Sequence, residues 1–214
     1  ADVNTPVNNK TYVRFVSAYS FENSFRDNGF AKNLFFAPSI RHQANEKLSF
    51  SLQTTFQNQT AANAPMVFLS RFSPLSFNNL DVFSILEEKS FTSDQLTIAN
   101  ISTSFQGEMN YIFNKNWSSK TVIARSTTTS DGYYQYLWDS ANGDEFTRFL
   151  SNQNGTTYST NIQQNFLGNF NTGTIKHQVL TGFDYFQKNI RNNRTGWVAL
   201  GTVSLLNGTD TGIL

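Results

Sequence analysis

Long stretches of this chain alternate between apolar and polar side chains, and that period of two constrains the fold more than any other feature. In residues 48–56 the even positions are Leu, Phe, Leu, Thr and Phe, while the odd positions are Ser, Gln and Thr. A similar alternation runs through residues 100–113. Successive side chains of a β-strand point to opposite faces of its sheet, so this period predicts strands. One face of each strand is therefore apolar and the other is polar.

The alternating segments divide the chain into strands joined by connections of two lengths. We expect strands at residues 11–21, 34–43, 48–57, 95–113, 117–128, 158–170 and 175–187. Short turns are expected at 7–10, 45–47, 114–116 and 171–173, and longer loops at 23–33, 58–92, 129–157 and 188–214. Bacterial outer-membrane barrels have short periplasmic turns and long extracellular loops. The sequence therefore predicts an all-β, antiparallel transmembrane β-barrel with the short turns at its periplasmic end.

The composition excludes several classes of function. Charged residues make up 14% of the 214 residues, and a net charge of +1 provides no long-range attraction for nucleic acid. The chain has no cysteine, which excludes thiol chemistry and thiolate metal sites. It has two histidines, so few residues are available for a histidine-based catalytic site. The adjacent carboxylates Glu87-Glu88 and Asp144-Glu145 fall in predicted loops, where such pairs are typical of solvated turns. We therefore expect no catalytic residue, no protein metal site and no enzyme activity.

Aromatic residues gather in two of the predicted long loops. One group holds Tyr133, Tyr134, Tyr136 and Trp138, and the other holds Phe68, Phe72, Phe77 and Phe83. Aromatic rings in extracellular loops offer large contact areas on which a ligand can stack. The alternatives are that the first group belongs to the interfacial girdle of a barrel and that the second packs within its own loop. The first group, with Phe72 and Phe77 from the second, forms our set of candidate ligand-binding residues.

Charged side chains recur on the polar face of the predicted strands. They are Arg14, Glu22, Arg41, Glu108, Lys176 and Asp184. Ionisable groups at membrane depth face a protein interior or a water-filled cavity. We expect these side chains to face the lumen of the barrel and to form structural pairs, for example with an internal domain. The alternative is that they line a solvated channel.

The segment from Phe166 to Tyr185 resembles a hairpin of TonB-dependent siderophore receptors of the ferrichrome-receptor type. It contains a strand, the turn Thr172-Gly173, and a second strand that reads His-Gln-Val-Leu-Thr-Gly-Phe-Asp-Tyr. Residues 2–7, 24–27 and 37–40 are similar to the opening of the same barrel domain and occur in the same order. One departure is Thr5, where the family usually has glycine before the proline.

The resemblance implies that residues 1–214 are a partial barrel domain, with the N-terminal plug and the remaining strands absent from this chain. About eight strands of a barrel of about 22 are expected. The implied function is active transport across the bacterial outer membrane: uptake of a ferric siderophore or a similar ligand, driven by TonB through the plug. Iron would arrive within the ligand, so no cofactor is implied. Outer-membrane lipid would surround the wall, and a surface lipoprotein over the loops is left open as a partner.

Two other classes of protein fit the alternation. One is a self-contained small outer-membrane barrel that serves adhesion or structure, in which the first strand pairs with the last. The other is a secreted β-sandwich that binds carbohydrate through its aromatic loops. Closure of the sheet separates the small barrel from the receptor, and solubility without detergent would identify the sandwich.

Overall fold

The computed structural model describes residues 1–70, 87–142, 144–208 and 210, and the elements within them are β-strands. They are β1 (Asp2–Asn8), β2 (Thr11–Asn23), β3 (Phe30–Asn45), β4 (Leu48–Ala62), β5 (Met66–Phe68), β6 (Thr97–Asn114), β7 (Trp117–Asn142), β8 (Glu145–Thr172), β9 (Ile175–Asn192) and β10 (Val198–Ser204). In this part of the chain, no helix is long and apolar enough to cross a membrane. The prediction of an all-β chain is confirmed.

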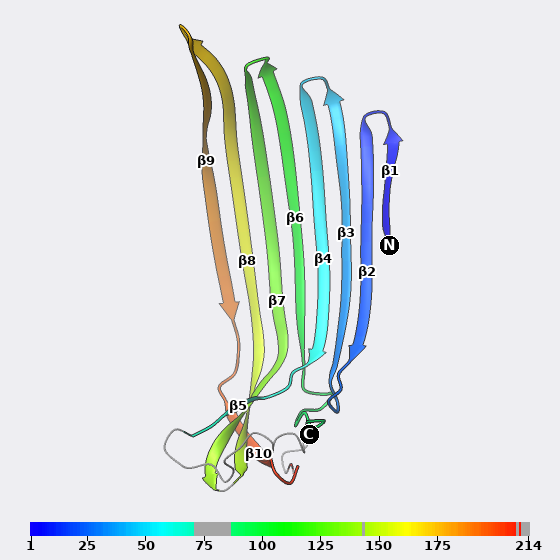
Figure 1. Ribbon diagram of the computed structural model, residues 1–214, viewed down its shortest axis with the longest axis vertical. Helices are drawn as coiled ribbons and strands as arrows, with labels where there is room; N and C mark the ends of the chain where they lie inside the picture. The colour runs from blue at the N-terminus through cyan, green and yellow to red at the C-terminus, as the bar shows by residue number, and fades with distance from the viewer. Residues whose placement is uncertain (71–86, 143, 209, 211–214) are drawn as a thin grey trace.

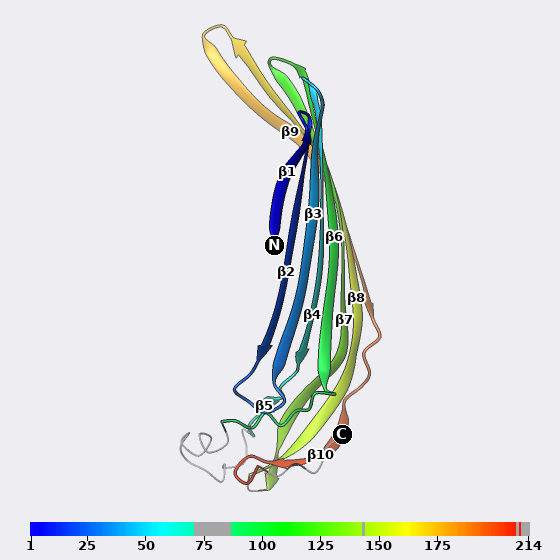
Figure 2. The same cartoon turned by 90° about the vertical axis from the view of Figure 1, so that its right-hand side faces the viewer.

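One curved sheet holds all ten strands (Figure 1). Its order is β1-β2-β3-β4-β6-β7-β8, and β9 and β10 pair with different parts of the long strand β8. The pairs are antiparallel except for that of β5 with β7. Seen from the side, the sheet is a single layer over most of its length (Figure 2). Among the described residues β1 pairs with β2 alone, so the sheet does not close. Neither a small closed barrel nor a two-layered sandwich describes this fold.

The predicted short turns are confirmed, and they lie together at one end of the sheet (Figure 1). Two residues separate the strands in each of them: 9–10, 46–47, 115–116 and 173–174. Next to these turns, a Cβ built on Gly168 would come 2.4 Å from the ring of Trp117. The absence of that atom lets the indole lie across the neighbouring strand, because the two residues are directly paired.

The prediction of a loop at residues 129–157 is wrong. β7 continues to Asn142 and β8 begins at Glu145, so the two strands form one very long hairpin. The Asp-Gly signal that favours a turn lies inside β7, where Gly132 has a φ of +141° and its Cβ would come 2.1 Å from the carbonyl oxygen of Thr97. Only glycine permits this close approach, and the pairing of β6 with β7 ends there. Gly132 therefore marks the end of a strand pair rather than a turn.

The other long connections also contain more strand than predicted. β3 begins at Phe30, β4 extends to Ala62, β9 extends to Asn192, and β5 and β10 lie in segments predicted as loops. In the extension of β4 both faces carry polar or small side chains, in the segment Gln-Asn-Gln-Thr-Ala-Ala. A period of two is invisible where both faces have the same polarity, so the sequence pattern ends before the strand does.

The strand register brings apolar positions of neighbouring strands side by side. One row across the sheet joins Ile40, Leu52, Gly107 and Ile123. Leu52 and Ile123 are each 45% exposed, although they lie in the middle of this apolar row. We use the term wall for β1 to β4, β6, β9 and residues 117–132 and 153–172. The side that carries this row is its apolar face, and the other side is its polar face.

Three of the charged residues that the sequence assigns to the polar face have polar partners on adjacent strands. Arg14 Nη2 lies 2.6 Å from Asp2 Oδ2, and Lys120 Nζ lies 2.8 Å from Glu108 Oε2. Asp184 accepts a hydrogen bond of 2.8 Å from the amide of Asn161 on the neighbouring strand. These contacts lie between adjacent strands and link them through side chains as well as through the backbone.

The end of the sheet opposite the short turns has a different construction. Four segments form what we call the distal sheet: β5, residues 133–142, residues 145–152, and β10. Its buried core consists of Leu137, Phe146, Val203 and Leu205, and Phe91 packs against it. The distal sheet thus has a hydrophobic core of its own, beyond the single-layered wall.

Candidate ligand-binding site

Five aromatic side chains meet on the distal sheet, and we call them the aromatic cluster. They are Phe68 of β5, Tyr136 and Trp138 of β7, Phe149 of β8, and Trp197 just before β10. The strand register explains why they meet. Phe68 is the direct partner of Trp138 in the parallel pair, and Phe149 is the direct partner of Tyr136 in the antiparallel pair. Side chains of paired residues lie on the same face of a sheet, so the cluster follows from the pairing.

Tyr136 lies at the centre of the aromatic cluster. Its ring centroid is 5.0 Å from that of Phe149, in a stacked arrangement. It is also 4.7 Å from the ring of Trp197 and 5.5 Å from the ring of Phe68, both edge to face. Aromatic pairs attract one another at these separations. The rings therefore hold one another in place on paired strands.

The outer members of the aromatic cluster keep much of their surface open. Trp138 is 51% exposed, Trp197 is 46% exposed and Phe68 is 41% exposed. An exposed ring on a strand offers its π-face to a planar group or to a cation. The five side chains include no carboxylate, amine or imidazole, so the cluster is suited to binding and stacking rather than to proton transfer.

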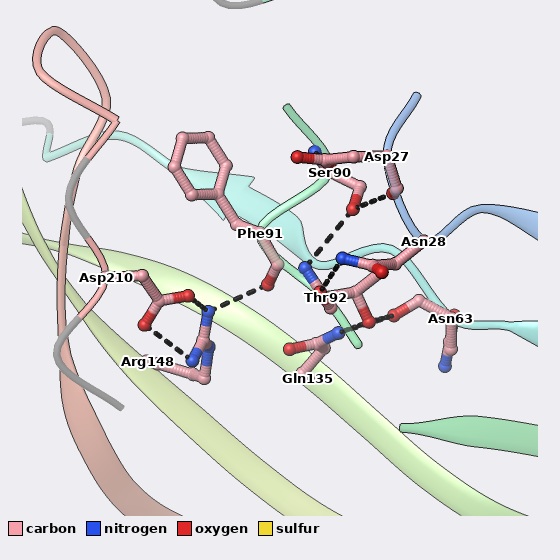
Figure 3. Close-up of polar contacts among 9 residues, drawn as sticks. All are labelled: Asp27, Asn28, Asn63, Ser90, Phe91, Thr92, Gln135, Arg148 and Asp210. Carbon is pink, nitrogen blue, oxygen red and sulfur yellow. Dashed lines mark hydrogen bonds and ion pairs between the residues drawn. The ribbon is translucent and has the colours of Figure 1, made fainter. Parts of the chain in front are cut away.

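The opposite side of the distal sheet is tied to the loops by a group of polar contacts that we call the junction (Figure 3). The guanidinium of Arg148 is buried in it. Its Nη2 donates a hydrogen bond of 2.8 Å to the carbonyl oxygen of Phe91, and its Nη1 lies 2.9 Å from Oδ1 of Asp210. A buried charge with this set of partners joins β8, the connection before β6 and the segment after β10.

Gln135 connects the junction to β7. Its side-chain amide donates hydrogen bonds of 2.6 Å to the carbonyl oxygen of Asn63 and to the hydroxyl of Thr92. The amide of Asn63 in turn donates to the carbonyl oxygen of Tyr133 at 2.8 Å. Gln135 and Tyr136 are neighbours on β7, so the contacts that hold Gln135 also fix the strand that carries the centre of the aromatic cluster.

Asp27 anchors the tip of the β2–β3 hairpin to the junction. Its Oδ1 accepts a hydrogen bond of 2.7 Å from the backbone N–H of Ser90, and its Oδ2 lies 3.3 Å from the ammonium of Lys89. Partial burial acts to raise the pKa of this carboxyl, but the hydrogen bonds from Ser90 and the charge of Lys89 outweigh it, so the pKa lies below its ordinary value. The ionised form of Asp27 is therefore the one that holds the two loops together.

Asp144 anchors the segment after β10 to the tip of the β7–β8 hairpin. Its carboxylate accepts hydrogen bonds from the hydroxyl of Ser204 and from the backbone N–H of Leu206, the latter at 3.0 Å. The hydrogen bond from Ser204 lowers the pKa of Asp144 and outweighs the opposing effect of burial. Asp144 is thus a structural carboxylate rather than one of a catalytic pair.

The cavity nearest to the junction is small. It measures about 220 Å³ and is lined by residues that include Asn28, Lys89, Arg148 and Asp210. Pockets for drug-sized ligands measure about 300–1,000 Å³, so this cavity does not suit a ligand of siderophore size. Among the residues that the structure describes, no three His, Asp or Glu side chains are placed to hold a metal ion.

Only some of the aromatic residues predicted to bind a ligand lie in the aromatic cluster. Tyr136 and Trp138 lie in the aromatic cluster, although on a strand and not in a loop. Tyr133 and Tyr134 are partly exposed on the same strand and make no ring contact among the described residues. Phe72 and Phe77 lie outside the described residues, as does Phe83. The sequence pattern does not select Phe149 and Trp197, because only strand pairing brings them to Tyr136.

The fold is that of part of the barrel wall of outer-membrane siderophore receptors, as comparison with solved structures shows. The ferric-catecholate import receptor Fiu of E. coli K12, in its closed form, matches with a TM-score of 0.79 and 17% identity, over 100% of this chain and 32% of the receptor. BauA, the ferric preacinetobactin receptor of Acinetobacter baumannii, matches with a TM-score of 0.77 and 12% identity, over 100% of this chain and 32% of the receptor.

The ferripyoverdine receptor of the outer membrane of Pseudomonas aeruginosa is a third solved structure with this fold. It matches with a TM-score of 0.64 and 15% identity, over 91% of this chain and 27% of the receptor. This chain therefore spans about a third or less of the length of these receptors. No protein-family model matches the sequence, and no curated protein matches it.

Proposed function

We propose that this chain forms part of the barrel wall of an outer-membrane receptor that takes up a ferric siderophore or a similar iron ligand. The observation that carries the proposal is the match of the whole chain to the walls of Fiu and BauA, which are receptors for ferric ligands. Fiu, BauA and the ferripyoverdine receptor are receptors and not enzymes, which supports binding and transport over catalysis. A plug and further strands would come from outside residues 1–214.

The two faces of the wall support a position in the outer membrane. Leucine, isoleucine and phenylalanine side chains are exposed on the apolar face, where acyl chains of lipid would cover them. The polar face carries the ion pairs of Arg14 and Glu108 and would line the lumen. With short turns on the periplasmic side, as in bacterial outer-membrane barrels, the distal sheet would lie outside the cell.

The aromatic cluster is the ligand contact that we propose within this chain. Its exposed rings suit a ligand with planar aromatic or unsaturated groups, because such groups stack on indole and phenyl faces. Iron would be held by the ligand itself. Tyr136 and Trp138 would make the main contacts, and the partly exposed Tyr134 would lie beside them on the same face of the strand. Tyr133 lies on the opposite face, with Gln135.

Binding of a ferric ligand tests this proposal directly. The full-length protein in detergent is titrated with ferric catecholate, and quenching of tryptophan fluorescence is measured. Replacing Trp138 by alanine is expected to weaken binding about tenfold, since a lost stacking contact is worth about 1.4 kcal/mol. The matched control is Trp117→Ala, which removes an indole at the opposite end of the sheet and is expected to leave binding unchanged. Equal affinities for all three proteins would contradict the assignment of the site.

We propose further that transport is driven by TonB through the plug. Cells that carry the full-length protein are expected to take up radioactive iron as the ferric ligand and to stop when a protonophore collapses the inner-membrane gradient. Surface binding of the ligand should persist under the same treatment. Uptake that continues without the gradient would indicate a passive pore and overturn this part of the proposal.

A further inference from the structure

One ring of the aromatic cluster is not placed by strand pairing. The other four members lie on β5, β7 and β8, whereas Trp197 belongs to residues 193–197, which we call the link. The link joins β9 to β10 along the same edge of β8 (Figure 1). It is not a strand, yet the ring centroid of Trp197 lies 4.7 Å from that of Tyr136. Contacts other than a regular ladder therefore hold this ring.

The face on which Trp197 lies depends on a shift of one residue in the pairing with β8. The register of β9 on β8, continued through the link, would bring Trp197 opposite Leu150. Leu150 is the partner of Gln135, so an indole there would lie on the side of the junction. Instead Val198 is opposite Leu150. Because side chains alternate between the two faces, this shift turns Trp197 to the side of the aromatic cluster.

The regular ladder ends at Thr195, where its hydrogen bonds are rearranged. The backbone N–H of Asn193 donates to the carbonyl oxygen of Asn154 at 2.7 Å, and that of Thr195 donates to the carbonyl oxygen of Asn152 at 3.0 Å. In a regular antiparallel pair, the backbone N–H of Asn152 would donate in return to the carbonyl oxygen of Thr195. It donates instead to the side-chain Oγ1 of Thr195, at 2.9 Å. The hydroxyl of Thr195 thus takes the place of its own carbonyl group.

The carbonyl oxygen of Thr195 has a different donor. It accepts a hydrogen bond of 2.9 Å from the hydroxyl of Ser151, whose side chain is buried. The amide of Gln153 donates to the same hydroxyl at 3.1 Å and so helps to orient it. The next residue is Gly196, and a Cβ built on it would meet nothing within 4 Å. The side-chain position at that point is open, which leaves the hydrogen bonds of Thr195 to fix the link just before Trp197.

We propose that Thr195 is a positioning residue of the ligand site: its hydroxyl ends the ladder with β8, and the indole of Trp197 thereby comes to lie beside Tyr136. Without the hydroxyl, the N–H of Asn152 regains the carbonyl oxygen of Thr195 as its acceptor, and the link continues in the register of β9. Trp197 then leaves the aromatic cluster, because that register places its side chain on the side of the junction. Thr195 acts through Trp197, and its effect on ligand binding rests on the proposed function.

The position of Trp197 is measured first, without ligand. The full-length protein in detergent is labelled with 5-fluorotryptophan, and the fluorine NMR signal of Trp197 is identified by its loss in Trp197→Phe. Thr195→Val removes the hydroxyl and keeps the size of the side chain, so it is expected to shift this signal and to leave that of Trp117 in place. Thr195→Ser keeps the hydroxyl and should restore the wild-type signal.

The matched control for this measurement is Thr156→Val on the wall part of β8. It removes a hydroxyl that lies 3.2 Å from the hydroxyl of Thr129, and it is expected to leave the signal of Trp197 unchanged. An unshifted signal of Trp197 in the Thr195→Val protein would overturn the proposal. If that protein does not fold, Ser151→Ala removes the donor to the carbonyl oxygen of Thr195 and should shift the signal of Trp197 instead.

Binding of ferric catecholate then shows whether Thr195 acts through Trp197. Thr195→Val is expected to weaken binding about fivefold, the loss expected for one aromatic contact, and Trp197→Ala should weaken it equally. Thr195→Ser should bind as the wild-type protein does. In a protein that already carries Trp197→Ala, Thr195→Val is expected to weaken binding no further, because the ring through which it acts is gone. A further fivefold loss in the double variant would contradict the proposal, since Thr195 would then act by another route.

The two measurements let this inference and the proposed function fail separately. A wild-type protein that binds no ferric catecholate, but whose Trp197 signal shifts on Thr195→Val, contradicts the proposed function and supports the positioning of Trp197 by Thr195. A wild-type protein that binds the ligand, with an unshifted Trp197 signal and unchanged affinity in the Thr195→Val variant, contradicts the positioning role alone.

Discussion

The wall and the distal sheet are built from continuous strands, yet they are stabilised in different ways. In the wall, large apolar side chains such as Leu52 and Ile123 remain exposed on a single layer. In the distal sheet, Leu137, which lies on the same strand as Ile123, is fully buried, and Phe146 of β8 is 1% exposed. The wall depends on its surroundings to cover its apolar face, whereas the distal sheet buries a core as a water-soluble domain does. The strand β7 therefore runs from a single-layered region with exposed apolar side chains into a region with a buried core.

Removing the core of the distal sheet should give the largest effect. Phe146→Ala is expected to destabilise this region by about 3–5 kcal/mol, because a fully buried ring leaves a cavity. Hydrogen exchange measured by mass spectrometry in detergent should then accelerate in residues 133–152 and remain slow in the wall. Leu52→Ala, on the apolar face of the wall, serves as the control and should leave exchange in the distal sheet unchanged. Uniform acceleration in both regions would show that they are not stabilised separately.

A charge placed on either face of the wall tests which face meets lipid. Leu52→Arg is expected to cost about 2–4 kcal/mol near the bilayer midplane. Gln53→Arg puts the same side chain on the polar face and should be tolerated. Folding into lipid vesicles is followed by the mobility of unheated protein on gels. If Gln53→Arg were the more damaging change, the assignment of the faces would be reversed.

The boundary between the two regions depends on Gly132. Its φ of +141° and the 2.1 Å approach of a Cβ to Thr97 make Gly132→Ala strained, at a cost of about 1–3 kcal/mol. The midpoint of urea unfolding in lipid vesicles should fall accordingly. Gly196→Ala is the control, because a Cβ there meets nothing within 4 Å. Equal midpoints for the two variants would mean that the close approach at Gly132 is easily relieved.

The anchor at Asp27 should give the smallest effect, because its carboxylate is partly exposed. Asp27→Asn weakens the contacts to Ser90 and Lys89 by about 1 kcal/mol and should speed exchange in residues 24–29. Since folding lowers the pKa of Asp27, its contribution is complete at neutral pH and is lost as the pH falls below the ordinary carboxyl value of about 4. In the wild-type protein, residues 24–29 should therefore stay protected from hydrogen exchange at pH 5 and lose protection near pH 3. The Asp27→Asn protein should show no such change in protection between the two pH values.

The sequence predicts the wall well and the distal sheet poorly, for a physical reason. Strands between two different solvents must alternate, so residues 48–57 and 117–128 are visible as strands in the sequence. Beyond Gly132 the two faces are covered by loops and by neighbouring rings, and the alternation of apolar and polar residues no longer marks the strand. The Asp-Gly pair at residues 131–132 then suggests a turn at a point where the strand continues.

The aromatic site shows the same division. Tyr136 and Trp138 stand out because they are close in sequence, and both belong to the aromatic cluster. Phe149 and Trp197 reach the cluster through strand pairing and through the return of the chain to β10. The anchoring of Arg148 by Asp210 is likewise a contact between distant segments. No local pattern marks such contacts, so the sequence could indicate the site but not its full membership.

The length of β7 has a consequence for where a ligand would first be met in the proposed orientation. Tyr136 lies 19 residues after Trp117, the first residue of this strand. At about 3.3 Å per residue, that is roughly 63 Å of strand between the short turns and the rings. A tilted strand crosses the hydrocarbon layer in about 9–11 residues, so about half of this length would stand outside the membrane. An incoming molecule would then be met at a distance from the bilayer.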